Sequence, residues 1–103
     1  MARVEFSSLA LADIAGILSD LNRNAGFPVV EKYRRNFDRL VLTNLSRFPE
    51  MCEARPQLGA HIRVGVVYPY LVVYRYRPQD DVVGVVRVLH GRRKITRALV
   101  NAS

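Results

Sequence analysis

Three β-rich segments follow one another in the second half of the chain, and they restrict the fold more than any other feature. Only short turn-forming stretches separate them, Tyr68-Pro69 and residues 78–81. Strands joined by such short loops pair antiparallel, because a parallel pair needs a long crossover. The sequence therefore predicts a three-stranded antiparallel meander with strands at 61–67, Tyr70–Arg77 and Val82–His90.

Two amphipathic helices are expected before the meander. Apolar residues recur at three- and four-residue steps up to Gly26, while Asp13 and Asp20 fall on the opposite, solvent-facing side. Gly26 suits the end of the first helix, and Pro28 suits the first turn of the second, which runs to Pro49. The short link between them makes the two helices antiparallel neighbours.

A short edge strand at Arg3–Phe6, a loop at 49–60 and a last helical turn or two within 92–100 complete the prediction. Neither the helix pair nor the sheet can bury its apolar face alone, so the two layers are expected to pack on each other. The fold class is α+β in the order β-α-α-β-β-β. We expect one domain over residues 1–103.

Positive charge is concentrated in the second half of the chain. Residues 1–51 carry a net charge of +1 and residues 52–103 carry +6, out of a total of +7. Fourteen of the sixteen basic residues are Arg, which favours planar contacts with carboxylates or phosphates. This charge attracts nucleic acid or an acidic protein segment, and it does not choose between them.

Other site classes have little support in the sequence. Cys52 is the only cysteine, which excludes a disulfide framework and favours a reducing compartment. With His61 and His90 it makes too sparse a set for a metal centre, so neither metal nor cofactor is expected. The chain opens with charged residues rather than a signal peptide, and its apolar runs are shorter than a membrane span. We therefore expect a cytoplasmic protein without a membrane partner.

Three tyrosines share one face of the middle strand: Tyr70, Tyr74 and Tyr76. They have two interpretations, a stacking platform for nucleic-acid bases or packing under the helices, and packing is the simpler one. Arg75 and Arg77 then lie on the opposite, solvated face.

Several strings in this order resemble the RelE/ParE superfamily of bacterial toxins, and its ParE branch in particular. They are Ala12-Asp13-Ile14, Asn24-Ala25-Gly26, Arg55-Pro56-Gln57-Leu58-Gly59, Val72-Val73-Tyr74-Arg75 and Val86-Arg87-Val88-Leu89-His90-Gly91-Arg92-Arg93. The resemblance implies the toxin of a type II toxin–antitoxin system that inhibits DNA gyrase by binding. It also implies a hetero-oligomer with a ParD-like antitoxin, whose acidic disordered tail folds onto the toxin.

The RelE branch implies an alternative, a ribosome-dependent messenger-RNA endoribonuclease. Arg63 matches a basic position of that branch, His90 can act as acid or base, and Arg92 can contact phosphate. The next expected Arg is replaced by Leu71, and no Tyr follows Tyr76. This incomplete set favours a binding toxin, with His90 as a packed histidine at a strand end.

For a binding toxin, the expected contacts with target or antitoxin are basic residues of the second half. They are Arg55, Arg75, Arg77, Arg92, Arg93 and Lys94.

Overall fold

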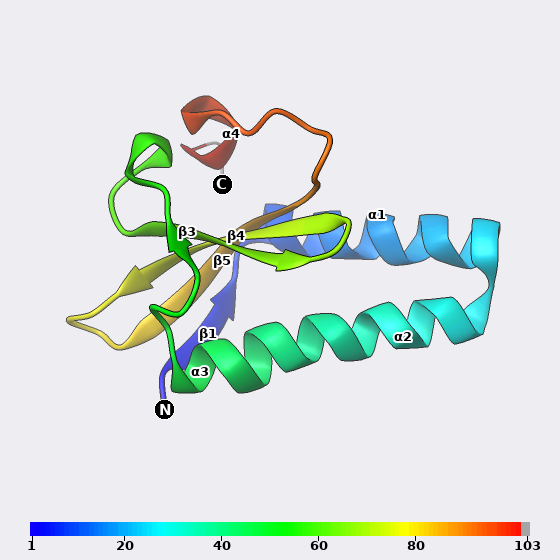
Figure 1. Ribbon diagram of the computed structural model, residues 1–103, viewed down its shortest axis with the longest axis horizontal. Coiled ribbons are helices and arrows are strands. Elements are labelled where there is room, and N and C mark those ends of the chain that lie inside the picture. The colour runs from blue at the N-terminus through cyan, green and yellow to red at the C-terminus, as the bar shows by residue number, and fades with distance from the viewer. Residues whose placement is uncertain (102–103) are drawn as a thin grey trace.

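The computed structural model describes residues 1–101 and shows one five-stranded mixed sheet with helical segments on both faces (Figure 1). The elements are β1 (Arg3–Phe6), α1 (Ser8–Ala25), α2 (Phe27–Asp38), η1 (Arg39–Asn44), α3 (Leu45–Arg47), β2 (Glu53–Ala54), η2 (Pro56–Leu58), β3 (Ile62–Val67), β4 (Tyr70–Arg77), β5 (Val82–His90) and α4 (Arg97–Asn101). The predicted α+β fold, with its edge strand, helical hairpin and meander, is confirmed.

The sheet is larger than the predicted meander. Its strand order is β1-β5-β4-β3-β2, with β1 running parallel to β5 and the other pairs antiparallel. The stretch at 49–60 is not purely a loop, because β2 pairs with β3 through two residues and η2 forms one 3-10 turn. Both additions are too short to leave a periodic pattern in the sequence.

The helical hairpin begins and turns where the sequence indicates. The Ser7 hydroxyl caps α1 by accepting from the amide of Ala10 at 3.0 Å, and Gly26 (φ 86°) links α1 to α2. The second helix is not uniform as expected, because after Asp38 it continues as the π-helical segment η1 and ends as α3. Among residues 1–101 no helix is both long and apolar enough to cross a membrane.

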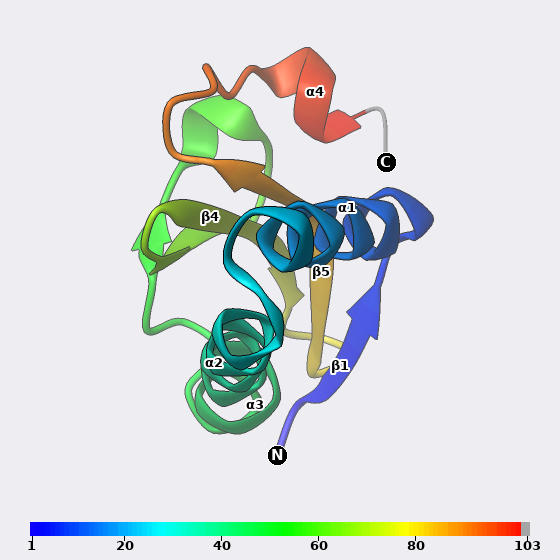
Figure 2. The same ribbon diagram turned by 90° about the vertical axis from the view of Figure 1, so that its right-hand side faces the viewer.

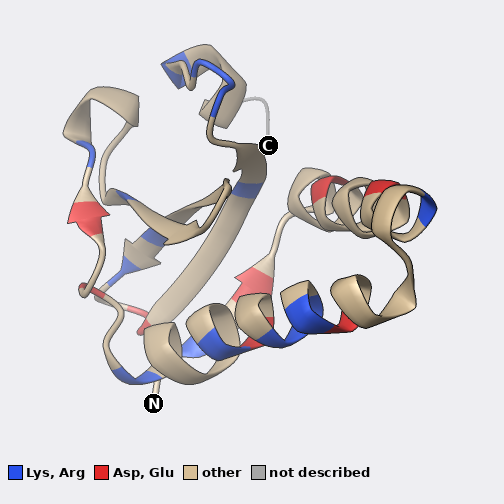
Figure 3. Cartoon of the chain, turned by 45° about the vertical axis from the view of Figure 1, so that its right-hand side comes forward, with Lys and Arg blue, Asp and Glu red and all other residues tan. Residues whose placement is uncertain are grey.

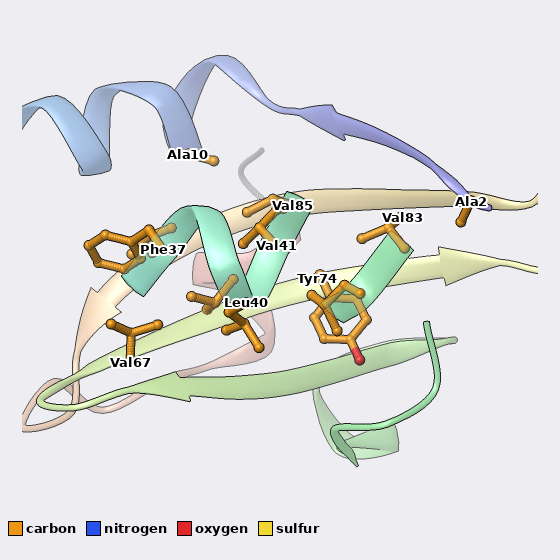
Figure 4. Close-up of a cluster of buried hydrophobic side chains, with 12 residues drawn as sticks. Ala2, Ala10, Phe37, Leu40, Val41, Val67, Tyr74, Val83 and Val85 are labelled. Carbon is orange, nitrogen blue, oxygen red and sulfur yellow. The ribbon is translucent and has the colours of Figure 1, made fainter. Parts of the chain in front are cut away.

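The main core lies between the hairpin and one face of the sheet (Figure 4). The predicted packing of the tyrosines is confirmed: Tyr74 is fully buried, and Tyr70 and Tyr76 pack against the same cluster. The buried Tyr74 hydroxyl donates to the Pro49 carbonyl at 2.8 Å, so no polar group is lost to the apolar interior.

The opposite face of the sheet carries a second core, where the sequence predicted a solvated face for the middle strand. Figure 2 shows α4 on the side of the strands away from α2. Val100 and Ile95 of the C-terminal segment cover Ile62, Val64 and Val73. Arg75 and Arg77 therefore lie at the rim of a partly covered face, because the last helical turns fold back over the strands.

Asp13 does not lie on the solvent-facing side of α1. Its carboxylate instead accepts from the amide of Val88 at 3.0 Å and from the guanidinium of Arg87 at 2.8 and 3.0 Å. The cause is that β1 stops at Phe6, opposite Val85, so that α1 crosses the edge of β5 just beyond. Helical periodicity alone does not reveal this crossing.

Candidate functional site

Three of the predicted contact residues are held by the protein itself. The Arg55 guanidinium pairs with Glu53 at 2.8 Å, and that of Arg77 pairs with Glu5 at 3.3 Å. Arg75 donates to a main-chain carbonyl of the loop before β3 at 3.2 Å. These contacts occupy part of each guanidinium and leave less of it for a partner.

The other three form one exposed turn, residues 91–94, here called the cationic turn. Within residues 1–101, the side chains of Arg92, Arg93 and Lys94 have no ion-pair partner. After Asp81 the sequence contains no further acidic residue. Figure 3 shows this basic stretch leading from β5 to α4. The cationic turn is therefore a concentrated positive charge that is free to meet an anion.

The backbone of the cationic turn is held firmly. Gly91 donates to the Pro69 carbonyl at 2.7 Å, and Arg93 donates to the His90 carbonyl at 2.9 Å. A Cβ on Gly91 would lie 2.9 Å from the Pro69 oxygen, so only glycine allows the two turns to approach this closely. The basic side chains thus project from a fixed backbone.

His90 lies at the exposed end of β5 with its ring against Tyr70. The ring centroids are 5.7 Å apart and the planes are nearly perpendicular, at 81°. Nδ1 accepts from the Arg92 amide at 3.0 Å, which assigns the proton of the neutral ring to Nε2. Burial raises the pKa of Tyr70.

Arg63 is bound to the loop that precedes β2. Its guanidinium donates to the carbonyls of Glu50 and Cys52 at 3.0 and 2.8 Å, and it pairs with the Glu50 carboxylate at 3.3 Å. Three contacts to one loop are typical of a residue that fixes local structure.

The structure does not bring Arg63 together with His90 and Arg92. Arg63 pairs with Tyr74 across β3 and β4, whereas His90 pairs with Tyr70 across β5 and β4. Those two positions on β4 are four residues apart, which is about 13 Å along a strand. Arg63 and His90 also lie on different sides of β4, so the three residues do not converge on one phosphate.

A groove runs from η1 across the end of β3 to the cationic turn. It consists of two adjoining clefts of about 470 and 550 Å³. The clefts share Tyr33, Val66 and Tyr68, and within residues 1–101 no Asp or Glu lines either of them. Three cations line them instead: Lys32, Arg39 and Arg92. We call this surface the basic groove.

Apolar side chains and a free strand edge form part of the basic groove. Val66 and Tyr68 are 61% and 84% exposed, which is unusual for such residues at the end of a central hairpin. On the outer edge of β3, β2 pairs only with Arg63 and Val64. Among the described residues the outer edge of β3 therefore has no strand partner at Val66.

Sequence reasoning missed four residues of the basic groove: Lys32, Arg39, Val66 and Tyr68. Lys32 and Arg39 are seven positions apart, which is two helical turns, so their common face could have been recognised. A neighbouring cation on the helix, Arg34, is neutralised by Glu31 and Asp38, and its hydrogen bond lowers the pKa of Glu31. Nothing in the sequence indicates that Lys32 and Arg39 face the end of β3.

Comparison with known proteins identifies what the chain is similar to. The sequence profile described as "ParE toxin of type II toxin-antitoxin system, parDE" matches residues 4–95. No curated protein sequence matches the chain.

Solved structures share the fold. A chain of the chromosomal ParDE toxin–antitoxin system from P. aeruginosa is 15% identical with a TM-score of 0.69, covering 87% of this chain and 96% of that one. A chain of the RelBE2 complex from Mycobacterium tuberculosis is 20% identical with a TM-score of 0.62, covering 86% and 96%. A chain of the intact E. coli RelBE complex is 18% identical with a TM-score of 0.59, covering 90% and 100%.

Proposed function

The chain belongs to the family of ParE toxins of type II toxin–antitoxin systems, and we propose from this that it acts by binding DNA gyrase and is neutralised by a ParD-like antitoxin. The gyrase target follows from the ParE branch of the family. The separation of Arg63 from His90 on the sheet supports action by binding rather than by RNA cleavage.

The observation that carries the proposed antitoxin contact is the composition of the basic groove. Among the residues that the structure describes, three cations and two exposed apolar side chains line it, and no acidic residue does. Charge-assisted hydrogen bonds to Asp and Glu and burial of Val66 and Tyr68 would both stabilise an acidic segment there. A disordered segment can follow such a long surface because it folds as it binds. The ParDE and RelBE structures that share the fold are themselves toxin–antitoxin systems.

The groove is tested by charge reversal. Lys32→Glu and Arg39→Glu should together weaken binding of the proposed ParD-like antitoxin at least tenfold, about 1.4 kcal/mol. Arg35→Glu is the matched control, because Arg35 is an exposed cation of α2 outside the groove with no ion-pair partner among residues 1–101. If Arg35→Glu weakens antitoxin binding as much as Lys32→Glu alone or Arg39→Glu alone, only the net charge of the protein matters.

The gyrase target is tested separately. Purified protein should inhibit DNA supercoiling or trap cleaved DNA, and added antitoxin should reverse the effect. No effect at micromolar protein would exclude gyrase as the target.

The second candidate function is a RelE-like endoribonuclease, which the RelBE structures of the same fold keep open. New cleavage sites in translated messenger RNA, lost in His90→Ala or Arg92→Ala, would establish it instead. Loss of cleavage in Arg63→Ala alone would not establish it, because Arg63 makes structural contacts to the loop before β2.

A further inference from the structure

The ion pair of Asp13 with Arg87 joins α1 to β5, and the two side chains are 16% and 10% exposed. The contact is bidentate, with Nε to Oδ2 at 2.8 Å and Nη2 to Oδ1 at 3.0 Å. As a whole residue Arg87 is only 8% exposed, and the hydrogen bonds that its guanidinium donates to the Asp13 carboxylate raise the pKa of Arg87. Oδ2 of Asp13 also accepts from the Val88 amide at 3.0 Å, so the carboxylate contacts both side chain and backbone of β5.

The same guanidinium reaches the C-terminal segment. Nη1 of Arg87 donates to the Leu99 carbonyl of α4 at 3.4 Å. The cationic turn lies between these two points of attachment, beginning three residues after Val88 and ending five residues before Leu99. Fixing both ends of a short connection fixes its path, so the pair acts on the orientation of Arg92, Arg93 and Lys94.

We propose that Asp13 and Arg87 are positioning residues, which hold the cationic turn in place and keep residues 95–101 against the second face of the sheet. The inference rests on the proposed function only where it assigns the cationic turn a role in contacts with a partner. Neither residue needs to touch that partner.

The physical basis is the dependence of α4 on tertiary contacts. A helix of five residues is far too short to be stable alone. Besides Ile95 and Val100 in the second core, the segment is held by Arg97, which donates to the Gln57 carbonyl at 3.2 Å. Removing the Asp13 charge would leave the Arg87 guanidinium buried without its counter-ion, which strongly favours its escape to water.

The experiment is hydrogen exchange on the intact chain with Asp13→Asn. Asparagine retains one acceptor for the Val88 amide and removes the charge. We expect exchange in residues 91–101 to become at least tenfold faster, while the central strand β4 changes less than threefold. Asp20→Asn is the matched control, because Asp20 lies on the same helix and is exposed, and its one ion-pair partner among residues 1–101 is the exposed Arg23.

Two results would overturn the proposal. One is an equal exchange rate of residues 91–101 in Asp13→Asn and in Asp20→Asn. The other is a uniform acceleration of exchange over β3, β4 and β5, because it would show that the Asp13–Arg87 pair only stabilises the whole fold. If Asp13→Asn does not fold, Arg87→Lys keeps the charge and loses the bidentate contact, and it should give the same local pattern. Faster exchange in β4 than in residues 91–101 of Arg87→Lys would contradict the proposal.

Antitoxin binding by the same variants tests whether the Asp13–Arg87 pair affects function. Asp13→Asn should weaken antitoxin binding in the same direction as Arg92→Gln with Arg93→Gln, whereas Asp20→Asn should not. If the unsubstituted chain binds no antitoxin, the proposed function fails while the exchange result still decides the positioning role. Full binding by Asp13→Asn despite faster local exchange would refute the link between the pair and partner contact.

Discussion

Gly65 lies where β3, the π-helical segment η1 and the loop before β2 meet, beside the basic groove. A Cβ built on Gly65 would lie 3.0 Å from the Cys52 sulfur and 3.1 Å from Cδ2 of Leu40. Both distances are shorter than the 3.5–4.0 Å at which carbon atoms attract each other best, roughly. Since Leu40 belongs to the main core, Gly65→Ala is expected to push a packed side chain out of place.

The expected cost follows from two opposing contributions. Overpacking a core by one methyl group costs about 1–3 kcal/mol. Alanine in a strand is more favourable than glycine by about 0.5–1 kcal/mol, because glycine loses more backbone entropy on folding. The net effect of Gly65→Ala should therefore be a loss of about 1 kcal/mol. Cys52→Ala in the same chain should recover part of it by removing the sulfur contact.

Urea unfolding measures this effect, and the chain provides its own control. Gly16 is exposed in α1, and a Cβ there would meet nothing within 4 Å. Gly16→Ala should therefore stabilise the protein by about 0.5–1 kcal/mol, from helix propensity alone. The two identical substitutions should shift the urea midpoint in opposite directions, each by about 0.3–1 M. A Gly65→Ala protein as stable as the parent would refute the close packing at this position.

Three further predictions concern single side chains. Gly91→Ala should cost about 1–3 kcal/mol in urea unfolding and shift the amide resonances of residues 91–94, because its Cβ would meet a carbonyl oxygen at 2.9 Å; unchanged resonances would contradict the close approach of the two turns. Burial raises the pKa of Tyr74 above its ordinary value of 10.0. The neutral phenol therefore contributes its full stability to the fold below pH 10, and this contribution is lost as the pH rises further. Tyr74→Phe should reduce the loss of stability at alkaline pH and cost about 1 kcal/mol at pH 7. Leu45→Ala should cost about 2–5 kcal/mol because Leu45 is fully buried, whereas thermal unfolding of Leu42→Ala, at a half-exposed site, should show little change.

The helical hairpin and the meander were predicted correctly because a periodic apolar pattern requires only that one face of an element packs against one adjacent layer. One buried face is enough to recognise each of them from the sequence. Gly26 marks the turn of the hairpin, and Tyr68-Pro69 marks a turn of the meander. The second core was missed because the cover comes from residues 95–101, which have no clear pattern. A strand face covered by a short distant segment resembles a solvated one in sequence when its rim carries Arg75 and Arg77.

The candidate site was predicted only in part for a related reason. Arg92, Arg93 and Lys94 are neighbours in sequence, so their common exposure was visible without a fold. The basic groove joins the consecutive segments α2 and η1 to the end of β3, which comes later in the chain. The charges of Lys32 and Arg39 do not indicate which strand end they face. The sequence also does not show which arginines are available to a partner. Arg55 and Arg77 resemble Arg92 in sequence, but in the structure they form ion pairs with Glu53 and Glu5.

Asp13 shows how one edge of the sheet is completed without a longer β1. The backbone of β5 continues to His90, past the last β1 pair at Val85. Side chains of the α1 region take over: the Ser7 hydroxyl donates to the Val86 carbonyl at 2.8 Å, and the Asp13 carboxylate accepts from the Val88 amide at 3.0 Å. The Asp13 side chain is 16% exposed, and the Arg87 guanidinium supplies the cation that compensates this largely covered carboxylate. The acidic residue within α1 and the basic residue within β5 thus act together where β5 extends past β1, and Nη1 of the same guanidinium donates to the Leu99 carbonyl of α4.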